Sequence, residues 1–485
     1  MTEIKATDKS DSKAAFSGRL RAGLASARSF RYRSLIRLAV ALAALLPIGV
    51  LLAGQGTDRP SLRIVEDNSG RIEQFVMQVA AGELPRLLPT IHDFVSQVGL
   101  QAEGYFVCAD QQDADRLAVY FQDWGLAQQE RFQISLLPEL STIWARDRYI
   151  AVRRGSGEST LLVPPFRDQV GGDFWVPQLL SRWIPGLAVL PAVFYLEGGD
   201  LVAGHRSLFV GATTVRFARE EVQPCTEAQV RLMLEGQFGK QVVFLPGFGN
   251  QDEVADDLDY HLDMFLTVCT DDSVLLADLA WGDRLMGQRE GNQAPDGPFD
   301  AEELEAIRAE HEIQRRRLEA VHGCLIGEGV PVRRVPLYWI PGADHGMTYN
   351  NVLQEETPDG PVVYLPQYGL EELDAAAVRV YVELGYEVRP VDVSQIFELQ
   401  GTLRCVVNVI RREPVLVEDE ENLHVRRGSE KRRYRAAGVA HTVPSLKQLQ
   451  GSGISKFARK SAVLERLPAQ NRTPRSPPRD APSAT

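Results

Sequence analysis

The chain of 485 residues is poor in cysteine and lacks the spacings that would tie its cysteines to a metal. It has five cysteines, with no Cys-x-x-Cys pair and no His/Cys spacing typical of zinc sites. A chain this long with so few cysteines is not a disulfide-stabilised scaffold, and it has no calcium-loop pattern. We therefore expect an ordinary globular protein whose activity needs no metal and no cofactor.

Basic charge is scarce in the body of the chain. The net charge is −12, yet residues 1–37 and 422–485 both carry an excess of Lys and Arg, so the segment between them is strongly acidic. An acidic body does not fit a nucleic-acid binder, and we predict no nucleic-acid partner. It favours instead the approach of cationic substrates.

Long apolar runs are also scarce, and the one that stands out is the uncharged segment 38–54. Its length is at the short end of the roughly 17–25 residues that cross a bilayer. Arg31, Arg33 and Arg37 precede it, so the positive-inside rule predicts a cytoplasmic segment 1–37, a transmembrane helix at 38–54 and an extracytoplasmic body. A cleaved signal peptide of a secreted protein and a buried helix of a cytoplasmic protein are the alternatives.

Strand-like and helix-like patterns alternate from about residue 70 to 414, which predicts a mixed α/β catalytic domain after a linker at 55–69. The recurring unit is a pair of strands, a helix and another strand. No sequence repeat accompanies it, so any internal symmetry must be structural. Residues 72–98 are expected to form one helix. Residues 415–485 are basic and rich in Arg, Pro and Ser, as in a mostly disordered tail.

Four short signatures combine a thiol, an imidazole and several carboxylates. They are Trp144-Ala145-Arg146-Asp147, Glu197-Gly198-Gly199-Asp200, His261-Leu262-Asp263 and Gly401-Thr402-Leu403-Arg404-Cys405. A single cysteine in a strand is usually a core residue, and a glutamate before two glycines often serves only a turn. In a strand, His261 and Asp263 would share one face. Their order along the chain makes a site for covalent chemistry on a cation the stronger interpretation.

In order and spacing, these motifs resemble those of the guanidine-modifying, or pentein, superfamily, and of the agmatine deiminases and bacterial peptidylarginine deiminases in particular. The segments Thr348-Tyr349-Asn350-Asn351 and Cys405-Val406-Val407-Asn408 extend the resemblance, which spans about residues 70–414. It implies a five-bladed, pseudo-symmetric α/β-propeller. It also implies a deiminase whose substrate is a cationic guanidino small molecule or an arginine-containing peptide.

The resemblance also implies roles for five catalytic residues. Asp147 and Asp263 would hold the planar guanidinium through charge-assisted hydrogen bonds. Cys405 would attack its central carbon as a thiolate, and acidic neighbours should raise the pKa of that thiol. His261 would act as general acid and then as general base, oriented by Glu197.

Trp144, Arg146, Asn350 and Arg404 are the predicted substrate-binding residues, with Trp144 covering the substrate. Arg404 departs from the family pattern, which has histidine before the nucleophile; it would meet a substrate carboxylate or carbonyl, or pair with a nearby acid. Tyr260 replaces a glycine, and Met264 replaces a polar amide.

A membrane-anchored hydrolase that releases ammonia is the first functional hypothesis. An amidinotransferase would use the same covalent intermediate, and an inactive pentein-fold binding module would keep only the fold. A papain-like protease is disfavoured, because such enzymes place the thiol at a helix start, whereas residues 403–410 are expected to form a strand.

Overall fold

The computed structural model describes residues 62–126, 129–155, 157–165, 168–222, 225–246, 261–289, 301–340 and 345–413. The predicted segment 1–37, the transmembrane helix 38–54 and the tail 415–485 therefore lie outside the described residues. Within the described part of the chain, no helix is both long enough and apolar enough to cross a bilayer.

The described residues form strands joined by helices and short 3-10 turns. The strands are β1 (Arg63–Ile64), β2 (Arg71–Val79), β3 (Glu103–Cys108), β4 (Phe132–Leu136), β5 (Ile150–Arg153), β6 (Ser159–Val163), β7 (Ala188–Pro191), β8 (Leu201–Ala203), β9 (Ser207–Val210), β10 (Gln241–Phe244), β11 (Leu266–Val268), β12 (Val274–Asp278), β13 (Val332–Trp339), β14 (Gly346–Thr348), β15 (Leu353–Thr357), β16 (Gly360–Gln367), β17 (Glu387–Asp392) and β18 (Val407–Glu413). The helices are α2 (Leu84–Gln97), α3 (Gln111–Asp123), α4 (Val176–Trp183), α5 (Ala212–Glu221), α6 (Glu227–Phe238), α7 (Leu279–Arg289), α8 (Ala301–Gly327), α9 (Glu371–Glu383) and α10 (Leu403–Val406). The 3-10 turns are η1 (Gln129–Arg131), η2 (Asp168–Trp175), η3 (Gly198–Asp200), η4 (Leu262–Met264) and η5 (Phe397–Leu399).

The described strands form five sheets that share one arrangement. Their orders are β18-β2-β3-β4, β1-β5-β6-β7, β10-β9-β8, β11-β12-β13-β14 and β15-β16-β17. Each contains an antiparallel pair, such as β15 and β16, followed by a helical crossover to a parallel strand, such as β17. This is the expected unit of two strands, a helix and a strand, now seen in the backbone without a repeat in the sequence.

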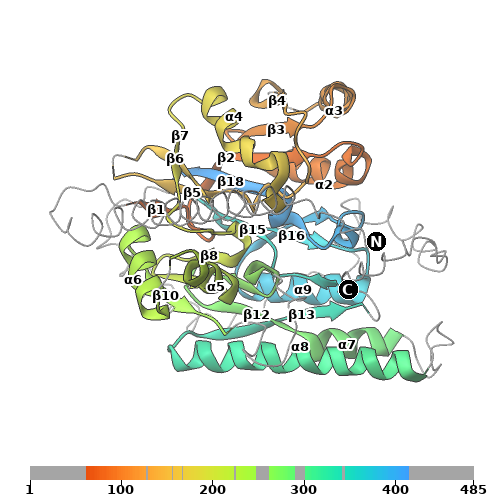
Figure 1. Cartoon of the computed structure of the whole chain (residues 1–485). Helices are drawn as coiled ribbons and strands as arrows, with labels where there is room; N and C mark the ends of the chain where they lie inside the picture. Colours follow the sequence, from red (N-terminus) through yellow and green to blue (C-terminus); the bar gives the residue numbers. More distant parts are fainter. Residues whose placement is uncertain are drawn as a thin grey trace, which may run out of the picture.

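The last strand of the described chain joins the sheet of an early one. Strand β18 pairs antiparallel with β2, so the last strand lies beside the first long one (Figure 1). Helices α7 and α8 run along the opposite side of the molecule, next to β12 and β13 (Figure 1). This closure brings Cys405, which directly precedes β18, next to segments from the N-terminal half.

Residues 62–69 are integrated into the folded body, although the sequence suggested a linker at 55–69. Strand β1 pairs with β5, and Ile64 and Val65 are buried. The Asn68 side chain is fully buried and donates to the Cys269 carbonyl at 2.7 Å. The folded body therefore begins no later than residue 62.

The helix expected at 72–98 is wrong in its first part. Residues 71–79 form β2, a central strand between β18 and β3, and its two faces are buried in different core clusters, Phe75 and Met77 in one and Val76 in another. Gly82, at a positive φ of 78°, separates this strand from α2, and a proline lies in the first turn of α2. A continuous apolar run in a central strand contains residues at three- and four-residue steps by chance, which is why it was mistaken for a helix.

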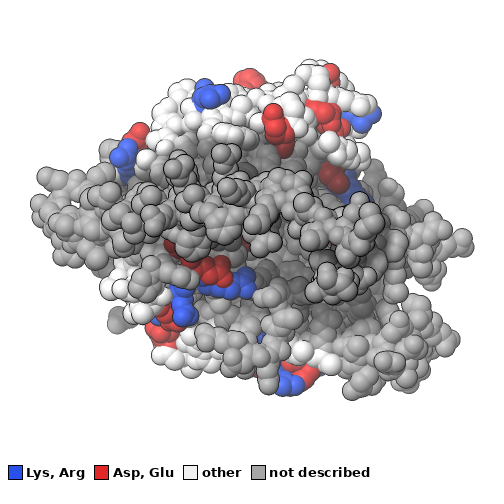
Figure 2. All heavy atoms as spheres, in the orientation of Figure 1, with Lys and Arg blue, Asp and Glu red and all other residues white. Residues whose placement is uncertain are grey.

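Aromatic packing holds the first sheet to its helices. The Phe75 ring contacts the rings of Phe94 and Phe106, at centroid distances of 5.0 and 6.1 Å. A Cβ on Gly104 would come within 2.6 Å of the Phe75 ring, so this strand position requires glycine. In the view of Figure 2, the described acidic and basic side chains are interspersed and do not gather into a patch of one sign.

Candidate active site

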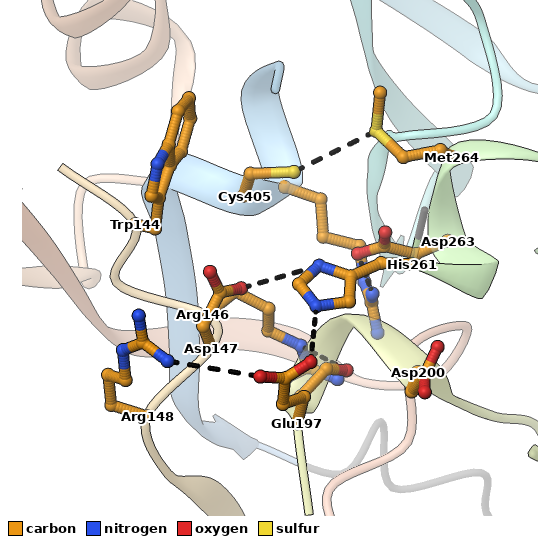
Figure 3. A network of polar contacts seen from close by, with 12 residues as sticks. Trp144, Arg146, Asp147, Arg148, Glu197, Asp200, His261, Asp263, Met264 and Cys405 are labelled. Carbon is orange, nitrogen blue, oxygen red and sulfur yellow. Dashed lines mark hydrogen bonds and ion pairs between the residues drawn. The ribbon is translucent and has the colours of Figure 1, made fainter. Parts of the chain in front are cut away.

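Each sheet contains the same unit of two antiparallel strands, a helix and a parallel strand. The candidate site is formed by residues that come just before the first strand of each unit. Asp147 precedes β5, Asp200 precedes β8, Asp263 precedes β11, Asn351 precedes β15 and Cys405 precedes β18. Each of the five units therefore contributes at least one side chain to the site from its equivalent end. Figure 3 shows most of these side chains gathered around the Cys405 thiol and the His261 ring.

The strand expected at 403–410 is wrong in its first part. Cys405 lies in α10, a four-residue helical turn, and the strand β18 begins only at Val407. His261 and Asp263 lie at and within the 3-10 turn η4, just before β11, so the condition that they lie in a strand is not met. The helical setting removes the strand argument against a papain-like protease; the partners of Cys405 have to decide that question.

Cys405 is buried, with 5% of its surface exposed, and its backbone is fixed from two sides. The Cys405 and Arg404 N–H groups donate to Asn351 Oδ1 at 3.2 and 2.7 Å. The Arg146 N–H donates to the Cys405 carbonyl at 3.2 Å. The thiol lies 3.5 Å from Asn351 Oδ1 and 3.9 Å from Met264 Sδ, so it is held between an amide and a thioether.

The pKa of the Cys405 thiol is raised well above its ordinary value. Burial is the main cause, and the charges of Asp263 and Asp147 add to it, while Arg404 opposes them. This confirms the expected influence of acidic neighbours. The thiol therefore needs a cation nearby, such as a bound guanidinium or a protonated His261, to become a thiolate.

His261 is held between two carboxylates. Its Nε2 lies 2.9 Å from Glu197 Oε2, and its Nδ1 lies 3.6 Å from Asp147 Oδ1 (Figure 3). Burial lowers the pKa of His261, but Asp147 and the Glu197 hydrogen bond outweigh it and raise that pKa well above the ordinary value. A Cβ on Gly199 would come within 2.5 Å of the His261 ring, so the second glycine of the Glu197 motif leaves room for the imidazole.

The carboxylates around His261 differ in their protonation. Burial tends to raise the pKa of Glu197, but hydrogen bonds from His261 and Tyr195 lower it to about 2. Burial raises the pKa of Asp147 to about 6, although His261 and Arg148 act against it. Burial likewise raises the pKa of Asp200 to about 7. Glu197 is therefore the anion beside the imidazole, whereas a bound cation would favour ionisation of Asp147.

Three buried carboxylate oxygens at the site have no hydrogen-bond partner among the described residues: Oδ1 of Asp147, Oδ1 of Asp263 and Oδ2 of Asp200. The first two belong to the aspartates predicted to hold the guanidinium, which are 8% and 1% exposed. Buried carboxylate oxygens are normally bonded, so an unpartnered pair at one site indicates a missing donor.

Arg146 and Arg404 use their guanidinium groups inside the protein. Arg146 donates from Nε to the Gly198 carbonyl at 3.1 Å and lies 3.5 Å from Asp67. Arg404 forms an ion pair with Asp263 and another, at 2.8 Å, with Asp67. Of the alternatives stated for Arg404, the pairing with a nearby acid is the one observed. Both arginines therefore bond protein groups beside Asp147 and Asp263, the two carboxylates predicted to hold the substrate guanidinium, which together form the predicted clamp.

The other two predicted substrate-binding residues lie differently. Trp144 is half-buried, and a Cβ on Gly401 would come within 2.5 Å of its ring, so it covers the turn before Cys405. The Asn350 amide turns away and donates to the Leu275 carbonyl at 2.9 Å and to Thr267. Its neighbour Asn351 faces Cys405 instead.

Several residues at the site escaped sequence reasoning. Asn351 is the last residue of the quoted Thr348–Asn351 segment, so its motif was found but the adjacent asparagine was chosen. Asp200 ends the Glu197 motif; its Oδ1 accepts the Leu262 N–H at 3.4 Å, and its Oδ2 has no partner among the described residues. Nothing in the sequence pointed to Asp67.

The loop that carries Trp144 is fastened by a buried aspartate. Asp173 Oδ1 accepts the Ser141 N–H at 2.7 Å and the Ser141 hydroxyl at 2.9 Å, and Asp173 also bonds the Thr142 hydroxyl. These bonds fix the approach to Asp147. Nowhere in the described ranges do three or more His, Cys, Asp or Glu side chains form a group that could hold a metal ion.

Comparison with known proteins gives one family and a set of structural neighbours. The family described as Porphyromonas-type peptidyl-arginine deiminase matches residues 78–409. The structure of an agmatine deiminase from C. jejuni is 14% identical and covers 73% of this chain and 96% of its own, with a TM-score of 0.51. A cysteine-substituted form of that enzyme with substrate bound is 15% identical, covers 73% and 97%, and has the same TM-score. No curated protein matches the sequence. At this identity the neighbours establish a pentein-type α/β fold.

Proposed function

Because the chain belongs to the Porphyromonas-type peptidyl-arginine deiminase family, it is a cysteine-dependent hydrolase of guanidino groups, and we propose that its substrates are peptidyl arginine and agmatine-like guanidines. The unpartnered Oδ1 atoms of Asp147 and Asp263 carry this proposal. A guanidinium is planar and offers several N–H donors, so it would satisfy both oxygens at once. Its charge would also favour ionisation of the Cys405 thiol.

The mechanism follows from the geometry around Cys405. The thiolate attacks the central guanidinium carbon, forming a C–S bond and a tetrahedral intermediate. Protonated His261 gives a proton to the departing nitrogen, which leaves as ammonia, and a thiouronium remains on Cys405. His261 then takes a proton from water, whose oxygen attacks the same carbon. The C–S bond then breaks with its electron pair on sulfur, the new hydroxyl loses its proton to solvent, and a ureido product and the free thiolate remain.

Substrate preference is proposed from the arginines near the site. Among the described residues, Arg146, Arg148 and Arg404 are each bonded to an acid or a carbonyl inside the protein. A free amino-acid carboxylate would therefore find its cation partners already engaged. This favours substrates in which that carboxylate is missing, as in agmatine, or is part of a peptide bond.

The purified body should be assayed with an internal-arginine peptide, agmatine and free arginine, measuring ammonia and ureido product. We expect turnover of the peptide or agmatine to exceed that of free arginine by about tenfold or more, since an unmatched charge is costly in a partly buried site. An added amine acceptor reports amidine transfer, and peptide fragments report proteolysis. Either of these in place of ammonia would contradict a guanidino hydrolase.

Asp147→Asn is expected to weaken substrate binding while the protein stays folded. The amide keeps the shape but loses the charge, and one charge-assisted bond is worth roughly 1.5–3 kcal/mol, so KM should rise about tenfold or more. Steady-state kinetics and thermal unfolding measure the two effects. Asp113→Asn is the matched control, because Asp113 is also buried but bonds the Gly82 N–H far from the cysteine in sequence. Equal kinetics for wild type and Asp147→Asn would leave Asp147 a structural residue.

The five sheets are proposed to be five blades of a pseudo-symmetric propeller. Two observations support this: the shared strand order of the units, and the position of site residues before β5, β8, β11, β15 and β18. A crystal structure in which successive units superpose by the same rotation about one axis would bear this out. A set of unrelated rotations would contradict it.

A membrane anchor at residues 38–54, with residues 1–37 in the cytoplasm and the catalytic body outside, is proposed from sequence alone. The apolar run and the arginines before it support the orientation. Protease added to intact spheroplasts should digest the body. Digestion only after lysis would contradict the orientation and would make cytoplasmic agmatine the better substrate.

A further inference from the structure

One of the two proposed clamp carboxylates already holds a guanidinium that belongs to the protein. Arg404 directly precedes Cys405, and its Nη1 is paired with Asp263 Oδ2. Its Nη2 reaches Asp67 Oδ1 at 2.8 Å and the Leu201 carbonyl at 3.1 Å. Arg404 and Asp263 are 4% and 1% exposed. Half of the Asp263 carboxylate is therefore committed to this bridge, and only Oδ1 remains for a ligand.

The far end of the bridge comes from outside the region that matches the family. Asp67 lies before β2, whereas the match begins at residue 78. Asp67 is fixed in turn, because its Oδ2 accepts the Ala203 N–H at 2.8 Å and its Oδ1 lies 3.5 Å from Arg146. The segment before β2 thus adds a largely buried carboxylate, with 15% of its side chain exposed, that tethers both the Arg146 motif and the residue before the nucleophile.

We propose that Arg404, anchored by Asp67, is a positioning residue that aims Asp263 Oδ1 at the substrate guanidinium and supplies positive charge beside the Cys405 thiol. This rests on the proposed function, in which Asp263 is part of the clamp. The Arg404 guanidinium is planar and bonds Asp263 through one nitrogen and Asp67 through the other. A carboxylate with one oxygen held in this way cannot rotate freely. Removing that cation would leave the buried Asp263 without its ion-pair partner and Asp67 with Arg146 alone. Arg404 thus acts through Asp263 and the thiol without contacting the substrate.

The first test measures the thiol without any substrate. The charged and titratable groups that influence Cys405 include Asp263, Asp147, Arg404 and Tyr368. Loss of the Arg404 cation leaves the acids unopposed, so ionisation of the thiol should require a higher pH. In Arg404→Ala we expect iodoacetamide to alkylate Cys405 about tenfold more slowly at neutral pH. Mass spectrometry of the peptide that contains Cys405 measures this rate. Because no turnover is needed, this readout stands even if the proposed reaction is wrong.

Chemical rescue separates the missing guanidinium from general damage. Arg404→Ala leaves a space between Asp263 and Asp67 that free guanidinium fits. Millimolar guanidinium chloride, well below denaturing concentrations, should restore most of the alkylation rate. Arg131→Ala is the matched control, because Arg131 is buried and donates to the carbonyls of Val95 and Ala102, with no contact to Asp263 or Asp67 among the described residues. Guanidinium should not accelerate alkylation of that variant.

Two further variants divide charge from geometry and keep the test valid if Arg404→Ala does not fold. Arg404→Lys keeps the charge but loses the two-sided bridge, so the thiol profile should stay near wild type while KM rises about tenfold. Asp67→Asn should slow turnover, and its effect should not add to that of Arg404→Lys, since both act through one bridge. An unchanged alkylation profile in Arg404→Ala, an absent guanidinium rescue, or additive effects of the two substitutions would overturn the proposal.

Discussion

Cys405→Ser is expected to lower the rate of ammonia release by at least about a thousandfold while leaving the fold intact, because the chemistry requires a thiolate nucleophile. Serine keeps the size of the side chain and a hydrogen bond to Asn351, so the buried turn α10 should be preserved. A serine hydroxyl is a far weaker nucleophile than a thiolate at neutral pH. The acids that already raise the pKa of the thiol would also disfavour ionisation of the hydroxyl. Steady-state assays and thermal unfolding of the same preparation measure both quantities.

A second cysteine provides the matched control for that substitution. Cys225 is partly exposed, and its sulfur lies 3.6 Å from the adjacent Thr226 carbonyl. Cys225→Ser should therefore retain full activity. With the wild-type protein and a guanidino substrate, acid quenching should trap an adduct on Cys405 whose mass corresponds to the thiouronium. Undiminished turnover in Cys405→Ser, or an adduct on another cysteine, would reject the mechanism.

The sequence predicted local structure best where a short-range signal decides it. Asp110 is a preferred N-cap residue before a helix-like pattern, and its side chain accepts the Asp113 N–H at 2.8 Å at the start of α3. Residues 104–108 have a pattern that predicts a strand, and they lie in β3. The strand β2 was missed because it is central in its sheet only through pairing with β18, more than three hundred residues away in the chain. Such long-range pairing leaves no local pattern to read.

The candidate site shows the same division. Cys405, His261, Asp147, Asp263 and Glu197 were all found from short motifs, and the fold brings them together. The motif at Thr348–Asn351 contained two adjacent asparagines, and only the backbone turn decides that Asn351 faces the cysteine while Asn350 bonds Thr267.

Asp67 marks the limit of motif reasoning at this site. It reaches Arg404 across 337 residues and belongs to a segment whose composition suggested a linker. The role of a largely buried carboxylate in such a segment becomes clear only when its partners are known. The ion pairs that Asp67 forms at the site could therefore be identified only from the structure.

His261→Gln is expected to lower kcat by about 10²–10⁴-fold, because ammonia would leave without a proton donor and water would attack without a base. The pH dependence should identify the reason. His261 must be protonated when ammonia departs, and Asp147 and Glu197 hold its pKa above the ordinary value against the effect of burial. Glu197→Gln keeps the shape but removes one of these charges, so the pKa of His261 should fall. The alkaline limb of kcat/KM should then move to lower pH.

The control for that shift is a second histidine with a glutamate partner. His205 Nδ1 lies 2.8 Å from Glu66, and this hydrogen bond raises the pKa of His205, but the pair lies outside the candidate site. His205→Gln should leave the pH profile of kcat/KM unchanged. If Glu197→Gln also leaves the alkaline limb in place, His261 is not the group that titrates there. If the alkaline limb moves to higher pH, the predicted direction of the shift is wrong, and Glu197 does not stabilise the imidazolium during turnover.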